Sequence, residues 1–390
     1  MPITQASQPS SDATPENGGR LLALAFLADP NSIHTRRWIG WFAARGHRVT
    51  MLVPAGVAVE AGLPDSIAVE PFTPHTSSRF HLLGALRARR SLTGALRRIE
   101  PDILHAHYLT GYGWHARMSG FRPYAITLWG TDILVTARST RRGRLYARLS
   151  LGPADLVTGD SDELVRAAVA AGARAERTHL VQFGVDTSRF SPGPDPAVLR
   201  SRLGLVGRRV IFSPRSIAPQ YRHDVVLDAV ASLPADVCLV MTRHLARESE
   251  VAALQRRAAD LGLSDRLIMV PKVAHGEMAD IYRLAEVVVS VPASDGTPVT
   301  LLEALSTGRP VVASDLPSVR EWLGDFDPAS LVPVGDVAAT ARAIEAALIR
   351  PAAERADLAR RGRQLVEERA SHDASMAGAE ALYRELLRRS

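Results

Sequence analysis

The sequence predicts an α/β protein made of two doubly wound, Rossmann-like domains that face each other across a cleft. The chain has 390 residues, which is more than one hydrophobic core usually supports. From about residue 20 onward, short apolar runs alternate with amphipathic stretches, the pattern of parallel strands covered by helices. This pattern stops at the Pro- and Gly-rich segment 184–200 and then resumes, so we expect a hinge there.

Each domain is predicted from its own series of strands. "LLALAFLA" at 21–28 is a buried strand by its length and purely apolar composition, and a helix from His34 to Gly46 follows it. A second strand comes directly after that helix. The remaining strands of the first half are expected at 102–107, 124–129 and 154–159. Those of the second half are expected at 209–214, 236–241, 266–271, 286–291 and 310–314.

These elements divide the chain into four parts. We expect a disordered segment over 1–19, a first domain over 20–187, a second domain over 188–370, and a C-terminal helix over 371–390 that packs back on the first domain. The first segment lacks the basic start and apolar stretch of a signal peptide. No apolar run approaches the roughly 18–20 residues that cross a bilayer. We therefore expect a cytoplasmic protein, either free or peripheral to the inner membrane face.

Composition excludes several classes of site. Hydrophobic residues make up 46% of the chain and charged residues 23%, as in globular proteins. Cys238 is the single cysteine, which excludes an intrachain disulfide and a CxxC zinc site. The net charge of +6 permits anionic ligands, and we expect no nucleic-acid partner. A dinucleotide enzyme is disfavoured, because "DPNSIHTRRW" after the first strand has no glycine for a GxGxxG turn.

Two acids flank the start of a predicted helix in "SDGTPVTLLEALSTGRPVVAS". Asp295 stands before it, Thr297 is the expected N-cap, and Glu303 lies about 9 Å further along the axis at ~1.5 Å per residue. Free N–H groups at a helix start attract anions, and Gly296 lets a phosphate approach the backbone. An elongated ligand such as a sugar nucleotide has this layout. Taken singly, each acid is more often structural, as a dipole partner or a solvated residue.

The same string resembles the signature of family 4 glycosyltransferases, which have the GT-B fold. That family has an acid, Gly, a nearby Pro, a second acid eight positions on, and then Ala and Gly-x-Pro-Val. The matching residues here are Asp295, Gly296, Pro298, Glu303, Ala304, Gly308, Pro310 and Val311. The first acid is usually Glu in the family, so Asp295 is one methylene shorter.

Other segments carry the same resemblance. "RRWIGWFAARGHRVTMLVP" is similar to the family's first helix and second strand, and "IFSPRSIAPQYRHDVVLDAV" to the opening of its second domain. There the family carries an Arg and then a Lys that bind the donor diphosphate. Arg215 matches the first, and Arg222 is the candidate substitute for the missing lysine; a solvated arginine at a helix start is the alternative. The full set of donor-binding residues implied in this way is Arg222, Gly296, Thr297, Pro298, Val299, Glu303, Lys272 and Val273.

The first domain contributes a histidine pair. "ILHAHYLTGYGW" places His105 and His107 on the same side of a strand, and one of them is expected to be buried structure. His107, nearer the carboxyl end, resembles the family histidine that meets the donor sugar. A metal is not expected, because no third ligand lies at a telling spacing and the family needs none. The acceptor-side candidates are Asn31, His34, Gly130 and Asp132, the last of which is alternatively a helix cap.

The resemblance implies a retaining glycosyltransferase with His107, Arg215 and Asp295 as its catalytic residues. The substrates would be a nucleotide-diphosphate sugar, with a UDP-sugar favoured, and a hydroxylated acceptor, with no cofactor. Two alternatives stay open: a sugar-nucleotide epimerase of the same fold, and a non-catalytic protein that binds sugar nucleotides. The Arg-rich segment 79–100 is predicted as a helix whose basic face is either solvated or in contact with anionic lipid. Donor sugar, acceptor, linkage and oligomeric state are left open by the sequence.

Overall fold

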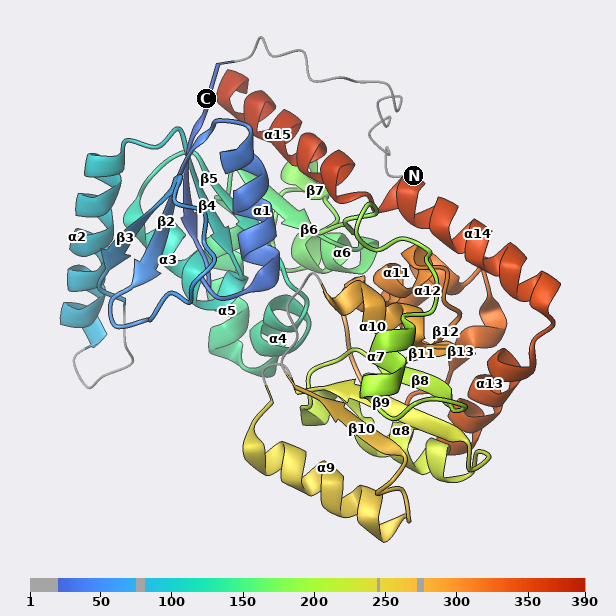
Figure 1. The fold of residues 1–390 in the computed structure, drawn as a ribbon. Coiled ribbons are helices and arrows are strands. Elements are labelled where there is room, and N and C mark those ends of the chain that lie inside the picture. Colours follow the sequence, from blue (N-terminus) through green and yellow to red (C-terminus); the bar gives the residue numbers. More distant parts are fainter. Residues whose placement is uncertain (1–19, 75–80, 244–245, 272–276, 390) are drawn as a thin grey trace.

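The protein folds into two parallel α/β sheets with helices on both faces (Figure 1). The computed structural model describes residues 20–74, 81–243, 246–271 and 277–389. The segment expected to be disordered, 1–19, lies outside the described residues, as do Lys272 and Val273. Within the described chain, no helix has the length and apolarity that crossing a membrane requires.

The first sheet has the strand order β3-β2-β1-β4-β5-β6-β7 among the described residues. Its strands are β1 (Ala23–Leu27), β2 (Arg48–Pro54), β3 (Ile67–Phe72), β4 (Ile103–His107), β5 (Tyr124–Thr127), β6 (Leu156–Gly159) and β7 (Thr178–Leu180). Its main helices are α1 (Ile33–Ala44), α2 (His81–Ile99), α3 (Trp114–Ser119), α5 (Arg141–Leu151) and α6 (Asp162–Ala170). Two short π-helical turns, η1 (Leu109–Gly113) and η2 (Asp132–Thr136), and the turn α4 (Ala137–Ser139) lie at the cleft side.

The second sheet repeats this winding with the order β10-β9-β8-β11-β12-β13. Its strands are β8 (Arg209–Ser213), β9 (Val237–Thr242), β10 (Leu267–Val270), β11 (Val287–Ser290), β12 (Val311–Ser314) and β13 (Leu331–Val332). Its helices are α7 (Ala197–Arg202), α8 (His223–Ala231), α9 (Glu248–Asp260), α10 (Met278–Leu284), α11 (Val299–Ser306), α12 (Pro317–Leu323) and α13 (Val337–Ile349). Two long helices end the chain, α14 (Ala352–Arg369) and α15 (His372–Arg389).

In both sheets the strand order reverses beside the first strand, between β1 and β4 and between β8 and β11. Doubly wound sheets bind ligands at that switch point, outside the carboxyl ends of the strands. The apolar runs that predicted these strands are almost fully buried, as in β1 and β11. Figure 1 shows the two sheets with these ends turned toward each other. The topology therefore sets one candidate ligand site between the domains.

The chain crosses between the domains twice at one place. Val185 donates its N–H to the carbonyl of Ala370 at 2.7 Å, and His372 donates its N–H back to the carbonyl of Val185 at 3.0 Å. Gly184 has φ +70°, and a Cβ there would lie 2.5 Å from the Cα of His372. Only glycine fits such a close backbone approach. The two crossings thus form a paired connection.

After this crossing α15 lies against α1 of the first domain (Figure 1). Tyr383 and Met376 are buried there. The indole N–H of Trp38 donates to the Tyr383 hydroxyl at 3.2 Å, and that of Trp41 donates to Asp373 at 2.7 Å. One continuous apolar core therefore includes α1, α15 and much of the second domain.

Candidate functional site between the domains

The two domains touch where their switch points face each other. Gly130, after β5, has φ +103°, and a Cβ there would lie 3.3 Å from the backbone nitrogen of Gly296. Gly296 belongs to the loop that links β11 to α11. His107 ends β4, Arg215 follows β8 and Asp295 follows β11. The candidate residues of both domains thus belong to facing strand ends.

Arg215 and Asp295 form the charged centre of the second domain's side. Their side chains are 12% and 15% exposed, and a guanidinium nitrogen lies 2.9 Å from a carboxylate oxygen. The guanidinium also lies 4.2 Å over the ring of Tyr221, which holds it by a cation–π contact. Burial raises the pKa of the Asp295 carboxyl, and the charge of Arg215 opposes that rise. The pair therefore places a carboxylate and a fixed cation next to each other at the carboxyl ends of β8 and β11.

Glu303 lies one turn inside α11 and is 8% exposed. The hydroxyl of Tyr282 donates a hydrogen bond to it at 2.8 Å. Burial raises the pKa of Glu303 to about 7, while this hydrogen bond and the charges of Arg37 and Arg215 act in the opposite direction. Arg37 comes from α1 of the first domain, so Glu303 is placed near a cation from the facing wall. Hydroxyl donors of a ligand would favour its charged form.

The entrance of α11 differs slightly from the prediction. The helix begins at Val299 and its N-cap is Pro298, so the expectation that Thr297 is the N-cap is wrong by one residue. Thr297 is turned to the first domain instead. Its N–H donates to a carboxylate oxygen of Asp160 at 3.3 Å, and its hydroxyl donates to the Asp160 carbonyl. Tertiary contact with Asp160, the residue that follows β6, therefore replaces the local cap.

His107 is 1% exposed and is enclosed by aromatic rings. The ring centroid of Trp38 lies 5.1 Å away and that of Trp129 6.0 Å away. Neither ring nitrogen has a hydrogen-bond partner within the residues that the structure describes. Burial, and then the charge of His34, lowers the pKa of His107 to about 3. His107 is therefore a neutral, buried imidazole whose two ring nitrogens have no hydrogen-bond partner among the described residues.

The second histidine of the pair is part of the core. One ring nitrogen of His105 contacts the Tyr383 hydroxyl and the other contacts the Thr127 hydroxyl at 2.7 Å. Because the Trp38 indole can only donate, Tyr383 accepts from it and donates its own proton to His105. His105 then donates from the nitrogen that faces Thr127. This network fixes the wall on which His107 stands, since the two imidazole centroids are 4.7 Å apart.

Two acceptor-side candidates are occupied within their own domain. Asp132 is fully buried and accepts backbone N–H bonds from Leu109 at 2.7 Å and from Trp129 at 3.0 Å. It also accepts from Ile133 at 3.0 Å. Asp132 is the first residue of η2, whose N-cap is Thr131, so the alternative that Asp132 caps this helix is wrong by one residue. Asn31 donates to the carbonyl of Ala58 at 2.9 Å. The side chains of Asp132 and Asn31 therefore hold the backbone of neighbouring loops by hydrogen bonds.

His34 and Gly130 stay at the cleft wall. The ring of His34 lies 4.8 Å from that of Phe183 and 5.8 Å from that of Trp129. Arg222, on the donor side, is paired with Asp224 at 3.0 Å, and a Cβ at Gly335 would lie 3.5 Å from its guanidinium. Its engagement with Asp224 is consistent with the alternative of an arginine at a helix start. Lys272 and Val273 lie outside the described residues.

Four residues that the structure brings to this site were not predicted from the sequence: Arg37, Asp160, Tyr221 and Tyr282. Arg37, Tyr221 and Tyr282 come from helical segments whose facing sides are set by tertiary packing. Asp160 had a readable signal, because it directly follows β6 at the carboxyl edge of the sheet. Among the described residues, no three His, Cys, Asp or Glu side chains gather as ligands of a metal ion.

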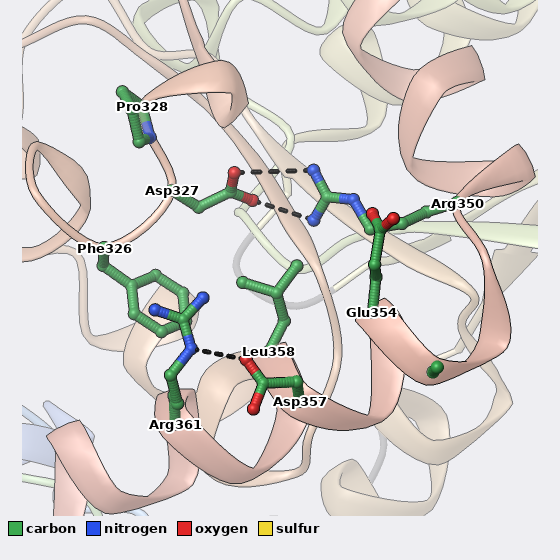
Figure 2. A pocket seen from close by; sticks show the side chains of 9 residues that line it. Phe326, Asp327, Pro328, Arg350, Glu354, Asp357, Leu358 and Arg361 are labelled. Atoms are coloured by element: carbon green, nitrogen blue, oxygen red, sulfur yellow. Dashed lines mark hydrogen bonds and ion pairs between the residues drawn. The ribbon is translucent and has the colours of Figure 1, made fainter.

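A surface cavity of about 530 Å³ lies beside α14, and none of the candidate residues named above lines it. Figure 2 shows its lining residues. Two ion pairs occupy it: Arg350 contacts Asp327 at 3.0 Å, and Arg361 contacts Asp357 at 2.9 Å (Figure 2). The Arg361 guanidinium also lies 5.3 Å from the Phe326 ring centre. Because these groups satisfy one another, we assign no ligand to this cavity.

The fold defines the class of this protein, which is GT-B. A structure of Anabaena Alr3699/HepE in complex with UDP and glucose superimposes with a TM-score of 0.79 at 22% identity, covering 93% of this chain and 99% of the other. Sucrose-phosphate synthase from Thermosynechococcus elongatus superimposes with a TM-score of 0.80 at 19% identity, covering 95% and 100%. At this level of identity the likeness concerns the fold.

The family follows from the sequence comparisons. Residues 23–161 match the model "Glycosyl transferase 4-like", and residues 199–365 match "Glycosyl transferases group 1". The chain belongs to the family 4 glycosyltransferases.

D-inositol 3-phosphate glycosyltransferase of Geodermatophilus obscurus is 32% identical over 270 residues, covering 64% of this chain and 60% of that protein. The enzyme of the same name from Frankia alni is 29% identical over 286 residues, covering 64% and 66%. This chain thus spans less than two thirds of the length of these relatives.

Proposed function

We propose that this protein is a retaining glycosyltransferase that moves a sugar from a nucleotide-diphosphate sugar to an acceptor hydroxyl. The observation that carries the proposal is the set of Arg215 after β8, Asp295 after β11 and Glu303 in α11. His107 ends β4 on the facing domain. Family membership supports the reaction class. A UDP-sugar is the favoured donor, and the related structure that holds UDP and glucose supports that choice.

Each residue has a task that its surroundings permit. Arg215 stabilises the negative charge of the departing diphosphate. Electrostatic stabilisation of this kind is usually the largest single contribution to catalysis. Asp295 accepts hydrogen bonds from sugar hydroxyls, and Glu303 accepts them from the ribose. His107 is neutral and has no hydrogen-bond partner among the described residues, and in this proposal it meets the sugar from across the cleft. The departing phosphate takes the acceptor's proton, so this proposal assigns no side chain as general base and includes no metal.

The acceptor belongs to the proposal only as a class, a hydroxylated molecule. The curated relatives are named for D-inositol 3-phosphate, so a phosphorylated cyclitol is the first acceptor to test. Closure of the domains about the paired crossing at Gly184–Val185 and Ala370–His372 excludes water, which limits hydrolysis of the donor. An epimerase would convert the donor without an acceptor, and a binding protein would show no turnover.

The donor site is tested by thermal unfolding with UDP, GDP, ADP or TDP. We expect one nucleotide to stabilise the wild type, because a ligand at 100 times its Kd adds about 2.7 kcal/mol. Glu303→Ala is expected to lose that shift, since it removes the carboxylate that we place at the ribose. Glu345→Ala, an exposed residue of α13, is the matched control and should keep it. Stabilisation of the wild type by none of the four nucleotides contradicts the proposal.

We further propose that α2 places the protein on an anionic membrane surface. Leu83 and Leu86 are 61% and 46% exposed on this helix. A surface groove of about 320 Å³ beside them is lined by Arg89, Arg90 and Arg97. Within the described residues, these three arginines have no ion pair or hydrogen bond. An exposed apolar strip with unpaired cations is typical of interfacial helices.

This contact is measured by co-sedimentation with phosphatidylcholine vesicles, with and without phosphatidylglycerol. Changing Arg89, Arg90 and Arg97 to Gln together is expected to weaken binding to the anionic vesicles on the order of 100-fold, at about 1 kcal/mol per charge. The control removes the same charge from exposed positions of the second domain: Arg256→Gln, Arg342→Gln and Arg355→Gln. Equal binding by both triple variants, or no binding by the wild type, contradicts the membrane contact.

A further inference from the structure

The start of α6 is held by two residues of the facing domain. Asp160, just before the helix, accepts two hydrogen bonds from Thr297. Its carboxylate accepts the Thr297 N–H, and its backbone carbonyl accepts the Thr297 hydroxyl. The carboxylate oxygens of Glu321, from α12, accept the N–H groups of Asp162 at 3.2 Å and of Glu163 at 3.1 Å. We call these four hydrogen bonds the α6 clasp.

The clasp completes a helix end that its own domain leaves unfinished. Ser161 is the N-cap of α6, and its hydroxyl accepts the N–H of Leu164 at 3.2 Å. The N–H groups of Asp162 and Glu163 belong to the same first turn, where a helix has no internal acceptors. Their acceptor is Glu321 of the other domain. The end of α6 is therefore fully capped only while the two domains are together.

Asp160 also lies against the loop that carries Asp295. A Cβ at Gly296 would lie 3.2 Å from a carboxylate oxygen of Asp160, so the loop backbone and this carboxylate are in close contact. Thr297 is 6% exposed and Asp160 is 3% exposed. Through Thr297, the position of Asp295 relative to the first domain depends on this contact.

We propose that Asp160 is a positioning residue: by holding Thr297 it fixes Asp295 and the entrance of α11 opposite His107 when the domains close. The inference rests on the proposed function, because it assigns the loop 295–297 to the donor site. Glu321 makes the second half of the same contact. Asp160 touches no substrate in this scheme and acts through the loop.

Closure of the clasp is linked to a proton. The charged groups that act on Asp160 are Asp295 from the β11–α11 loop, Asp132 from η2 and Glu321 from α12, and all of them are acids. Burial, together with these charges, raises the pKa of Asp160 well above its ordinary value, against the Thr297 hydrogen bond. The closed form therefore binds a proton more tightly than an open form in which Asp160 meets water. Closure is favoured as the pH falls and opposed as it rises.

The first test is hydrogen exchange of the peptides that hold Thr297, Asp162 and Glu163, in the full chain without any ligand. Asp160→Ala is expected to raise exchange in both peptides at least tenfold, while Asp160→Asn, whose amide oxygen still accepts from Thr297, stays near the wild type. After correction for intrinsic rates, the wild type is expected to exchange faster at pH 8 than at pH 6. Asp160→Asn should lose that pH dependence, which a purely structural contact would not show. Asp228→Asn, on the surface beside Arg257, is the control.

The second test separates this inference from the proposed function. Arg215, Asp295 and Glu303 all belong to the second domain, so Asp160→Ala is expected to bind the stabilising nucleotide within about threefold of the wild type. Turnover of its sugar nucleotide is expected to fall at least tenfold, with a larger share lost to hydrolysis, and Asp160→Asn is expected to restore most of it.

Each failure has its own meaning. Unchanged exchange and turnover in Asp160→Ala overturn the clasp while nucleotide binding by the wild type still supports the function. Equal pH profiles of the wild type and Asp160→Asn overturn the proton linkage. If the wild type binds no nucleotide, the proposed function fails, and the exchange experiment still decides whether the clasp forms.

Discussion

Replacing Arg215 with methionine is expected to lower kcat/KM for the sugar nucleotide by roughly 10²–10³-fold, the usual effect of removing one charge-stabilising donor. The guanidinium is held by Asp295 at 2.9 Å and lies 4.2 Å from the Tyr221 ring centre, so its position is fixed before a diphosphate arrives. The measurement is release of nucleotide diphosphate under initial-rate conditions. Arg215→Lys keeps the charge but loses bidentate hydrogen bonding to a phosphate, so it should recover only part of the activity.

The same variant leaves the Asp295 carboxylate without its cation in a mostly buried place, which costs ~1–3 kcal/mol of folding free energy. A double variant, Arg215→Met with Asp295→Asn, removes that unpaired charge. It should regain stability in urea unfolding and stay inactive. If activity returns together with stability, the role of Arg215 is to stabilise the folded state, and its assignment to the diphosphate is wrong.

Tyr383→Ala is expected to destabilise the protein by ~3–5 kcal/mol, the range found when a buried aromatic side chain is deleted. The ring stacks on Phe42 with centroids 5.3 Å apart, and the hydroxyl joins Trp38 to His105. Tyr383→Phe keeps the ring but leaves polar atoms of Trp38 and His105 unpaired, at a cost of ~1–3 kcal/mol.

Urea unfolding followed by tryptophan fluorescence measures both changes, because Trp38 contacts Tyr383 directly. Leu387→Ala, on the same helix and only partly buried, is the control and should cost less than Tyr383→Ala. A loss below ~0.5 kcal/mol for both tyrosine variants would mean that α15 does not support the first domain.

The fold was predictable where strands are long and purely apolar, because complete burial leaves a continuous apolar run. β3, β7 and β13 escaped prediction for the opposite reason. β3 buries only its end residues Ile67 and Phe72 fully, and β7 and β13 have three and two residues. Such edge strands take their conformation from a neighbour's hydrogen bonds more than from their own composition.

The candidate site was predictable to the extent that its residues follow strand ends or match a family string. Arg37 and Tyr282 lie on α1 and α10 with no local signal, and only packing turns them toward Glu303. The direction of Arg222 was likewise open, because its sequence neighbour Asp224 competes with any ligand for the guanidinium. Spacing predicts which residues share an edge, and tertiary contacts decide which of them remain available.

The return of α15 to the first domain has a consequence for synthesis on the ribosome. The last strand of that domain ends at Leu180, yet the helix that covers Trp38 and Phe42 begins at His372, roughly 190 residues later. At about 5–20 residues per second, the nascent first domain waits roughly 10–40 s with this aromatic surface open. During that interval it is exposed to chaperones and to self-association, and its folding is completed only after α15 has left the exit tunnel.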